Sequence, residues 1–139
     1  MKHFLIVVDM QKDFISGALG TKEAQAILPR VAEKIVQAKK AGKTIVFTRD
    51  THHENYLDTQ EGKNLPVPHC IENTDGWQID PALDTAGAMI FDKPSFGSEA
   101  LVRYLKSLPD LQSAEFVGLC TDICVITNVL SAKCALPEL

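Results

Sequence analysis

The chain has 139 residues, of which 45% are hydrophobic and 23% are charged, and its formal net charge is −4 at pH 7. This composition is typical of one globular domain, which at this length buries about two-thirds of its unfolded surface. The acidic balance and the lack of a basic stripe argue against nucleic acid as a partner. The first apolar run, residues 4–8, is too short to cross a membrane and ends at Asp9, so we expect a cytoplasmic protein with no leader peptide and no membrane partner.

The hydrophobic pattern predicts strands and helices that alternate along the chain. Continuous apolar and β-branched runs predict buried strands at residues 4–8, 44–48, 88–91 and 115–119. Apolar residues at helical spacing predict helices over residues 22–41, 98–108 and 122–134. Residues 50–80 are predicted to form a long irregular loop, of the kind that is usually functional or disordered.

This alternation predicts an α/β fold for residues 1–139 as a single domain. The expected architecture is a three-layer, Rossmann-like parallel sheet with helices on both faces. We expect the first and last strands to be adjacent and central, with the strand order reversing between them.

Ionisable or nucleophilic side chains follow the carboxyl end of every predicted strand. In open parallel sheets these ends meet at one edge, where ligands bind. The shared location of the side chains is therefore a stronger signal than any one of them alone. They are Asp9 after the first strand, Asp50, His52 and His53 after the second, Asp92 and Lys93 after the third, and Cys120, Asp122 and Cys124 after the fourth.

Cys124 is the candidate nucleophile. Thr121 is predicted to cap the last helix, which places Cys124 in its first turn, where N–H groups and the helix dipole favour a thiolate. A nearby Lys93 would lower the thiol pKa further, and Asp9 would accept or return a proton. Taken singly, the three residues have structural alternatives, namely a core cysteine, a turn-capping aspartate and a solvated lysine. The four cysteines are expected to be thiols.

The loop after residue 50 offers ligands for a metal ion. Asp50 and His52 are two residues apart, so in an extended segment their side chains point to the same side. Imidazole and carboxylate groups together suit zinc, iron or manganese. The alternative is a polar loop with incidental histidines. Further donors in the loop are His53, Glu54, Glu61 and His69.

Five segments of the chain resemble the isochorismatase-like cysteine hydrolases and, within them, the nicotinamidases. In chain order they are Val7–Phe14, Thr48–His52, Pro68–Cys70, Lys93–Gly97 and Gly118–Val125. The Asp-x-His…His loop points to the nicotinamidase branch, because isochorismatases proper do not use a metal there. The resemblance implies a small-molecule amide substrate, hydrolysis of nicotinamide to nicotinate and ammonia through a thioester, a role in pyridine nucleotide salvage, and a homo-oligomer. Family members usually continue for another strand and helix beyond the position of Leu139.

The resemblance also implies roles for individual residues. It implies a catalytic triad of Asp9, Lys93 and Cys124. It implies a cis peptide between Leu119 and Cys120, which would aim the N–H groups of Cys120 and Cys124 at the oxyanion of a tetrahedral intermediate.

The same resemblance implies one divalent ion and a substrate pocket. The ion would be held by Asp50, His52 and His69, with Glu61 as the fourth ligand and Glu54 as the less favoured alternative. The aromatic walls of the pocket would be Phe14, Trp77 and Phe96.

Three other functions agree with parts of the pattern. A related hydrolase for another small amide or a carbamoyl compound would keep Asp9, Lys93 and Cys124 but need not bind metal. A catalytically inactive binding or assembly protein is a second alternative. A phosphoacceptor receiver domain is a third, but it needs an acceptor aspartate ending its third strand and a lysine after its fifth. Here Asp92 is followed directly by Lys93, so that layout does not fit.

Overall fold

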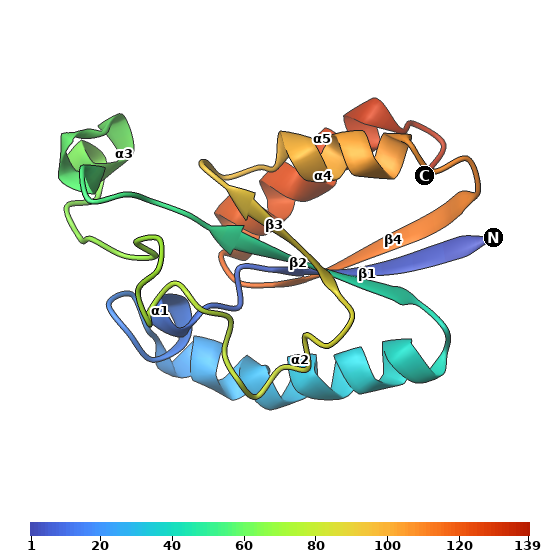
Figure 1. Cartoon of the computed structure of the whole chain (residues 1–139), viewed down its shortest axis with the longest axis horizontal. Coiled ribbons are helices and arrows are strands. Elements are labelled where there is room, and N and C mark those ends of the chain that lie inside the picture. Colours follow the sequence, from blue (N-terminus) through green and yellow to red (C-terminus); the bar gives the residue numbers. More distant parts are fainter.

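A four-stranded parallel sheet forms the middle layer of the protein, and the computed structural model describes residues 1–139 (Figure 1). The strands are β1 (Lys2–Val8), β2 (Thr44–Asp50), β3 (Met89–Lys93) and β4 (Leu111–Gly118). They lie in the order β3-β2-β1-β4, and each neighbouring pair is parallel. The strand order therefore reverses between β1 and β4, at the point where sheets of this kind bind ligands.

β4 lies at an edge of the sheet. It pairs with β1 along Lys2–Val8, and no other segment of residues 1–139 pairs with its second side. Most of its residues are consequently half-buried rather than buried. The predicted adjacency of β1 and β4 is confirmed, whereas the predicted central position of β4 is wrong.

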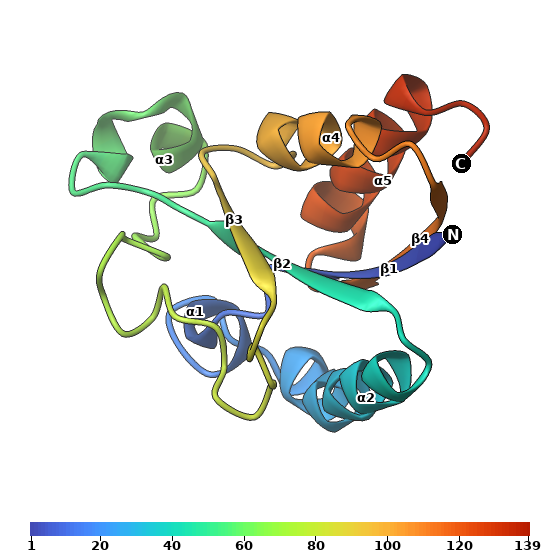
Figure 2. The same ribbon diagram turned by 45° about the vertical axis from the view of Figure 1, so that its right-hand side comes forward.

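Helices cover both faces of the sheet, which confirms the predicted three-layer α/β architecture. α2 (Lys22–Lys40) lies against one face, and α4 (Glu99–Lys106) and α5 (Ile126–Ala135) lie against the other (Figures 1 and 2). The side chain of Thr21 begins α2 by accepting a hydrogen bond from the Ala24 N–H, as an N-cap does. None of the helices is long and apolar enough to span a membrane.

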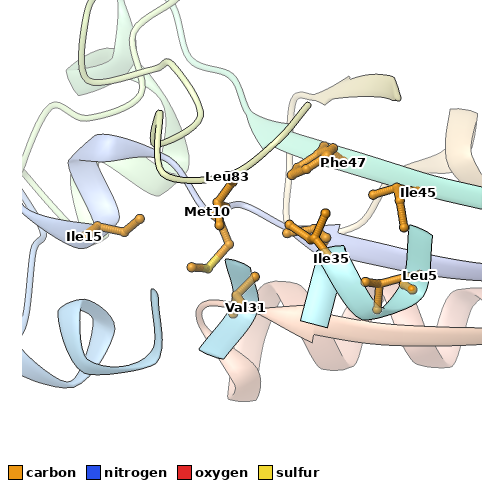
Figure 3. Packing of buried hydrophobic residues seen from close by; sticks show 10 residues of the cluster. Leu5, Met10, Ile15, Val31, Ile35, Ile45, Phe47 and Leu83 are labelled. Atoms are coloured by element: carbon orange, nitrogen blue, oxygen red, sulfur yellow. The ribbon is translucent and has the colours of Figure 1, made fainter. Parts of the chain in front are cut away.

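The core consists of two hydrophobic clusters, one on each side of the sheet. Leu5 and Val7 of β1 point to the α2 side, whereas Phe4, Ile6 and Val8 point to the side of α4 and α5. This alternation follows from the two-residue period of a strand, and burial of both faces explains why β1 is apolar throughout. Figure 3 shows the α2-side cluster, in which the labelled residues are Leu5, Met10, Ile15, Val31, Ile35, Ile45, Phe47 and Leu83.

Several short elements complete the carboxyl edge of the sheet. α1 (Lys12–Ile15) follows β1, and a 3₁₀ turn, η1 (Tyr56–Asp58), and α3 (Gln60–Asn64) lie in the predicted irregular loop. A turn of π-helix, η2 (Thr121–Val125), connects β4 to α5. Each of these has five residues or fewer, which is too short for hydrophobic periodicity to predict.

Candidate active site

Asp9 lies at the carboxyl end of β1 and is fully buried. It has a φ of 52°, a left-handed conformation that is uncommon for a residue with a side chain and that tends to occur at functional sites. Its backbone N–H donates to the Thr48 carbonyl, and the Thr48 hydroxyl donates to its Oδ1 at 2.7 Å. The carboxylate is thus held in one orientation by the neighbouring strand.

Lys93 ends β3, two strands away, and reaches Asp9 from there. Its Nζ lies 2.7 Å from Asp9 Oδ2 and 3.5 Å from Asp50 Oδ1, and it donates to the Ser95 carbonyl at 3.0 Å. Burial opposes the charge of this ammonium group, but Asp9 and Asp50 outweigh that effect and raise the pKa of Lys93. The lysine is therefore a buried cation shared by two carboxylates.

Cys124 lies in η2, directly after β4, with 5% of its surface exposed. Its place in the first helical turn is as predicted, but the residue before that turn is Cys120, not Thr121, and no side chain caps it. The pKa of the Cys124 thiol is raised by burial and by Asp9, with Lys93 acting in the opposite direction. The predicted lowering of this pKa is wrong, because desolvation and the nearby Asp9 carboxylate outweigh the charge of Lys93.

The protonation of the Asp9 carboxyl is shifted by its surroundings. Burial raises the pKa of the Asp9 carboxyl above its ordinary value, and the charge of Lys93 opposes the rise. A raised carboxyl pKa makes the group a stronger base in its ionised form, which suits an acceptor that must later return the proton. Asp9, Lys93 and Cys124 thus form a buried acid–base group at one edge of the sheet.

The turn between β4 and η2 brings Cys120 to the same place. Gly118 has a φ of 138°, and a Cβ on it would lie 2.1 Å from the Val8 carbonyl oxygen, so only glycine allows β4 to approach β1 so closely. Cys120 has a φ of 56°, and its N–H donates no hydrogen bond to another group of the chain, which leaves it free for an incoming oxygen. The peptide between Leu119 and Cys120 is trans, so the predicted cis bond is wrong. The positive φ angles of Gly118 and Cys120 provide the sharp turn.

A group of four metal-ligand side chains lies beside Lys93. The ligand atoms of Asp50, His52, Glu61 and His69 all lie within 4.8 Å of one another. The His52 Nε2 is 2.9 Å from Asp50 Oδ2 and 3.6 Å from Glu61 Oε1, and the His69 Nε2 is 3.5 Å from Asp50 Oδ2. Although burial opposes it, the hydrogen bonds from the two histidines and the charge of Lys93 lower the pKa of Asp50.

The surroundings of the histidines fit a metal ion. His69 Nδ1 lies 2.7 Å from the Val67 carbonyl oxygen, which can only accept, so Nδ1 carries a proton, and Nε2, which faces Asp50, is the ring nitrogen left to bind an ion. Two imidazoles and two carboxylates are a donor set that suits zinc, iron or manganese. Tyr56 packs edge-on against both imidazole rings, with ring centroids 4.7 Å from His52 and 5.1 Å from His69.

Of the two candidates for the fourth ligand, the structure places Glu61 in this group. Glu54 is exposed and is absent from it. His53 is also exposed and lies 3.3 Å from Glu72 instead. Sequence reasoning missed Tyr56, whose only signal was its location between the two predicted histidine ligands.

A cavity of about 690 Å³ is lined by the side chains of Asp50, His52, Glu61 and His69 and by Cys124. Phe14 and Phe96 line it, as predicted for aromatic walls. Trp77 does not line it. Trp77 is buried behind Phe14, donates from Nε1 to the Thr51 hydroxyl, and stacks under the Arg49 guanidinium at 3.6 Å. The complete lining is Phe14, Leu19, Asp50, His52, Thr59, Gln60, Glu61, Asn64, Leu65, His69, Pro94, Ser95, Phe96, Cys120, Ile123 and Cys124.

Gln11 holds the main chain of Asp50 in place, a role that was not predicted. Its buried side chain donates to the Asp50 carbonyl at 2.8 Å and to the Trp77 carbonyl at 2.9 Å, and it accepts from the Asp50 N–H at 2.7 Å. These bonds fix the N–H and the carbonyl of Asp50, whose carboxylate belongs to the candidate metal-ligand group. Its position two residues after Asp9, within the segment Val7–Phe14 that resembles the family, was the available signal.

This sheet, with its buried cysteine, aspartate and lysine, defines a hydrolase of the isochorismatase family. Residues 3–134 match the model of the family described as Isochorismatase domain, and the chain belongs to that family. The pyrazinamidase of Pyrococcus horikoshii, solved in complex with zinc, is 34% identical, with a TM-score of 0.83, and the match covers 97% of this chain and 80% of that one.

Two further similar proteins are enzymes with different names. The nicotinamidase of Acinetobacter baylyi is 27% identical over 162 residues, which is 93% of this chain and 73% of that protein. The structure of N-carbamoylsarcosine amidase from Thermoplasma acidophilum is 25% identical, with a TM-score of 0.81, and the match covers 95% of this chain and 76% of that one. The fold is thus shared by enzymes with different substrates.

Proposed function

We propose that the protein is a cysteine amidohydrolase that converts nicotinamide to nicotinate and ammonia. The observation that carries this proposal is a single cavity that has Cys124 in its wall together with the ligand group of Asp50, His52, Glu61 and His69. A thiol nucleophile can attack the carbonyl carbon of any amide. A metal site beside the thiol is useful only for a substrate that also carries an atom able to bind the metal. Nicotinamide has such an atom in its ring nitrogen.

The ion would be held by Asp50, His52, Glu61 and His69, and when bound it supplies a Lewis acid that orients the ring of the substrate. Phe14 and Phe96 line the space that the ring would occupy. Backbone N–H groups at Cys120 and Cys124 are proposed to receive the carbonyl oxygen as it becomes an oxyanion.

Acylation begins when Cys124 Sγ attacks the amide carbon while Asp9 accepts the thiol proton. Because the raised pKa keeps the thiol protonated, the proton is transferred only as the carbon–sulfur bond forms. Asp9 then protonates the leaving nitrogen, ammonia departs, and a thioester remains on Cys124.

Deacylation reverses these roles. Asp9 takes a proton from water, the resulting hydroxide attacks the thioester, and the proton returns to the sulfur as nicotinate leaves. Lys93 stays charged throughout and stabilises the ionised form of Asp9, from which its Nζ is 2.7 Å away. Without that cation, burial would favour the protonated form of the Asp9 carboxyl, which could not accept the thiol proton.

A related hydrolase for a carbamoyl compound is the second candidate, since N-carbamoylsarcosine amidase shares the fold. The metal-ligand group favours nicotinamide over it. An assay of ammonia release from nicotinamide, pyrazinamide and N-carbamoylsarcosine, with metal-loaded protein, compares the two directly. We expect turnover of the two aromatic amides. Turnover of N-carbamoylsarcosine alone would favour the second candidate, and no turnover of any would contradict an amidohydrolase.

A matched cysteine serves as the control for that assay. Cys134 lies on α5 and is exposed, away from the cavity. Cys134→Ser should retain full ammonia release, whereas Cys124→Ala should abolish it and leave substrate binding near normal.

A further inference from the structure

Asn128 is a fully buried polar residue of α5 that takes no part in the proposed chemistry. Its Nδ2 donates to the carbonyl oxygens of Cys124, at 2.8 Å, and Phe96, at 3.2 Å. Its Oδ1 accepts from the N–H of Ser98 at 3.0 Å. One side-chain amide therefore joins the turn that carries the nucleophile to the loop that carries Phe96.

That loop, residues 94–98, has few other attachments near the cavity. At its beginning, Lys93 Nζ donates to the Ser95 carbonyl. At its end, Gly97 packs so tightly against α5 that a Cβ on it would lie 2.9 Å from Thr127 Cγ2. Between them, Phe96 is 44% exposed and its carbonyl is held by Asn128 alone among side chains.

Cys124 and Phe96 line the same cavity, so their separation determines what fits between them. A planar amide offers two donors and an acceptor in fixed directions, which lets Asn128 hold three main-chain groups at once. A hydroxyl or an apolar side chain cannot do so. The amide thus fixes the main chain at Phe96 relative to the main chain at Cys124, and Asn128 itself does not line the cavity.

We propose that Asn128 is a positioning residue that sets the width of the cavity between Cys124 and Phe96. It thereby favours amides carried on a flat aromatic ring, which can pack against Phe96, over small aliphatic amides, which cannot. This inference rests on the proposed role of Cys124 as the nucleophile.

The test compares two alkylating reagents at Cys124 of the metal-loaded protein, N-phenylmaleimide and iodoacetamide, by peptide mass analysis. Only the first reagent carries an aromatic ring. The measured quantity is the rate with N-phenylmaleimide divided by the rate with iodoacetamide. In Asn128→Ala this ratio should fall by about tenfold, the size of effect expected when a pocket loses a packing contact. A merely structural defect would slow both reagents together and leave the ratio unchanged.

Thr127→Val is the matched control. It removes the hydrogen bond from Thr127 Oγ1 to the Ile123 carbonyl, one residue before Cys124, but keeps the methyl group beside Gly97. Its ratio should stay within about twofold of the wild-type value, because the substitution keeps the packing against Gly97 and leaves all three hydrogen bonds of Asn128 in place. If this variant shifts the ratio as much as Asn128→Ala, the proposal is refuted.

A second variant covers the case in which Asn128→Ala fails to fold. Asn128→Asp keeps the side-chain volume and the acceptor for the Ser98 N–H but loses the hydrogen bonds to the Cys124 and Phe96 carbonyls. It should therefore also lower the ratio. An unchanged ratio in a folded Asn128 variant, or loss of folding in both, would overturn the positioning role. The alkylation ratio does not depend on turnover, so a wild-type protein that released no ammonia would refute the proposed function alone.

Discussion

Replacing Lys93 by Met removes a buried cation that two carboxylates share. The Lys93 side chain is fully buried, and its Nζ is 2.7 Å from Asp9 Oδ2 and 3.5 Å from Asp50 Oδ1. Met has a similar length and fills the space, so the cavity left behind is small. The main effect is electrostatic, because Asp9 remains buried without its partner. Loss of one partner from a buried ion pair costs about 3–5 kcal/mol of unfolding free energy.

Urea unfolding measures this loss, with the single tryptophan, Trp77, as a buried fluorescent reporter. At a slope of about 2 kcal/mol/M, Lys93→Met should lower the urea midpoint by about 1.5–2.5 M. Lys43→Met is the matched control, since Lys43 pairs with Glu115 at the partly exposed surface. The control should change the unfolding free energy by less than about 1 kcal/mol.

The difference in unfolding free energy between wild type and Lys93→Met should depend on pH, because the pKa of Lys93 is raised in the folded protein. A basic group whose pKa is raised on folding contributes stability that is complete below its unfolded pKa, about 10.4, and is lost as the pH rises through the folded value. The gap between wild type and Lys93→Met should therefore persist at pH 7–9 and shrink at strongly alkaline pH. Equal urea midpoints for the two proteins at pH 7 would refute the buried ion pair.

Three further predictions concern the chemistry of the site. Asp9→Asn should lower the rate of ammonia release by about 10²–10⁴-fold, because it removes the proton acceptor, yet leave bound metal unchanged by elemental analysis; retained turnover would exclude Asp9 as the base. Alkylation of Cys124 by iodoacetamide should be slower than that of exposed Cys134 at pH 8 and should still be increasing above pH 9.0, the ordinary thiol value, because its pKa is raised; a plateau below pH 8 would contradict this. His69→Ala should lower the bound metal and raise the KM for nicotinamide, and an unchanged metal content would remove His69 from the ligand set.

The sequence was sufficient to predict the parts of the protein that depend on local patterns. The apolar run of β1 and the amphipathic spacing of α2 predicted their own positions, because burial imposes a period on the chain. The parallel topology then predicted that Asp9, Lys93 and Cys124 lie at one edge of the sheet, because the carboxyl ends of parallel strands meet there whatever their separation in sequence.

What could not be predicted depends on contacts between distant segments. The raised pKa of Cys124 reflects how fully the sulfur is buried and how near Asp9 lies, neither of which is written in the residues around it. The position of Trp77 also depends on distant segments. Its indole packs in a cluster with Phe14, donates a hydrogen bond to Thr51 and stacks against Arg49, so it does not line the cavity. The peptide before Cys120 is trans, and the chain turns there through the positive φ angles of Gly118 and Cys120. Of these two residues, only the glycine is a type that indicates such an angle from sequence.

The proposed reaction requires Cys124 to form a covalent bond to the acyl group of the substrate. Metal-loaded protein mixed with nicotinamide, quenched in acid within one turnover and digested, can be analysed by peptide mass. We expect one nicotinoyl group on the peptide that contains Cys124, absent from Cys124→Ala and present in Cys134→Ser. Ammonia release with no acyl group on any cysteine, or an acyl group on the peptide of Cys70 or Cys134, would contradict it.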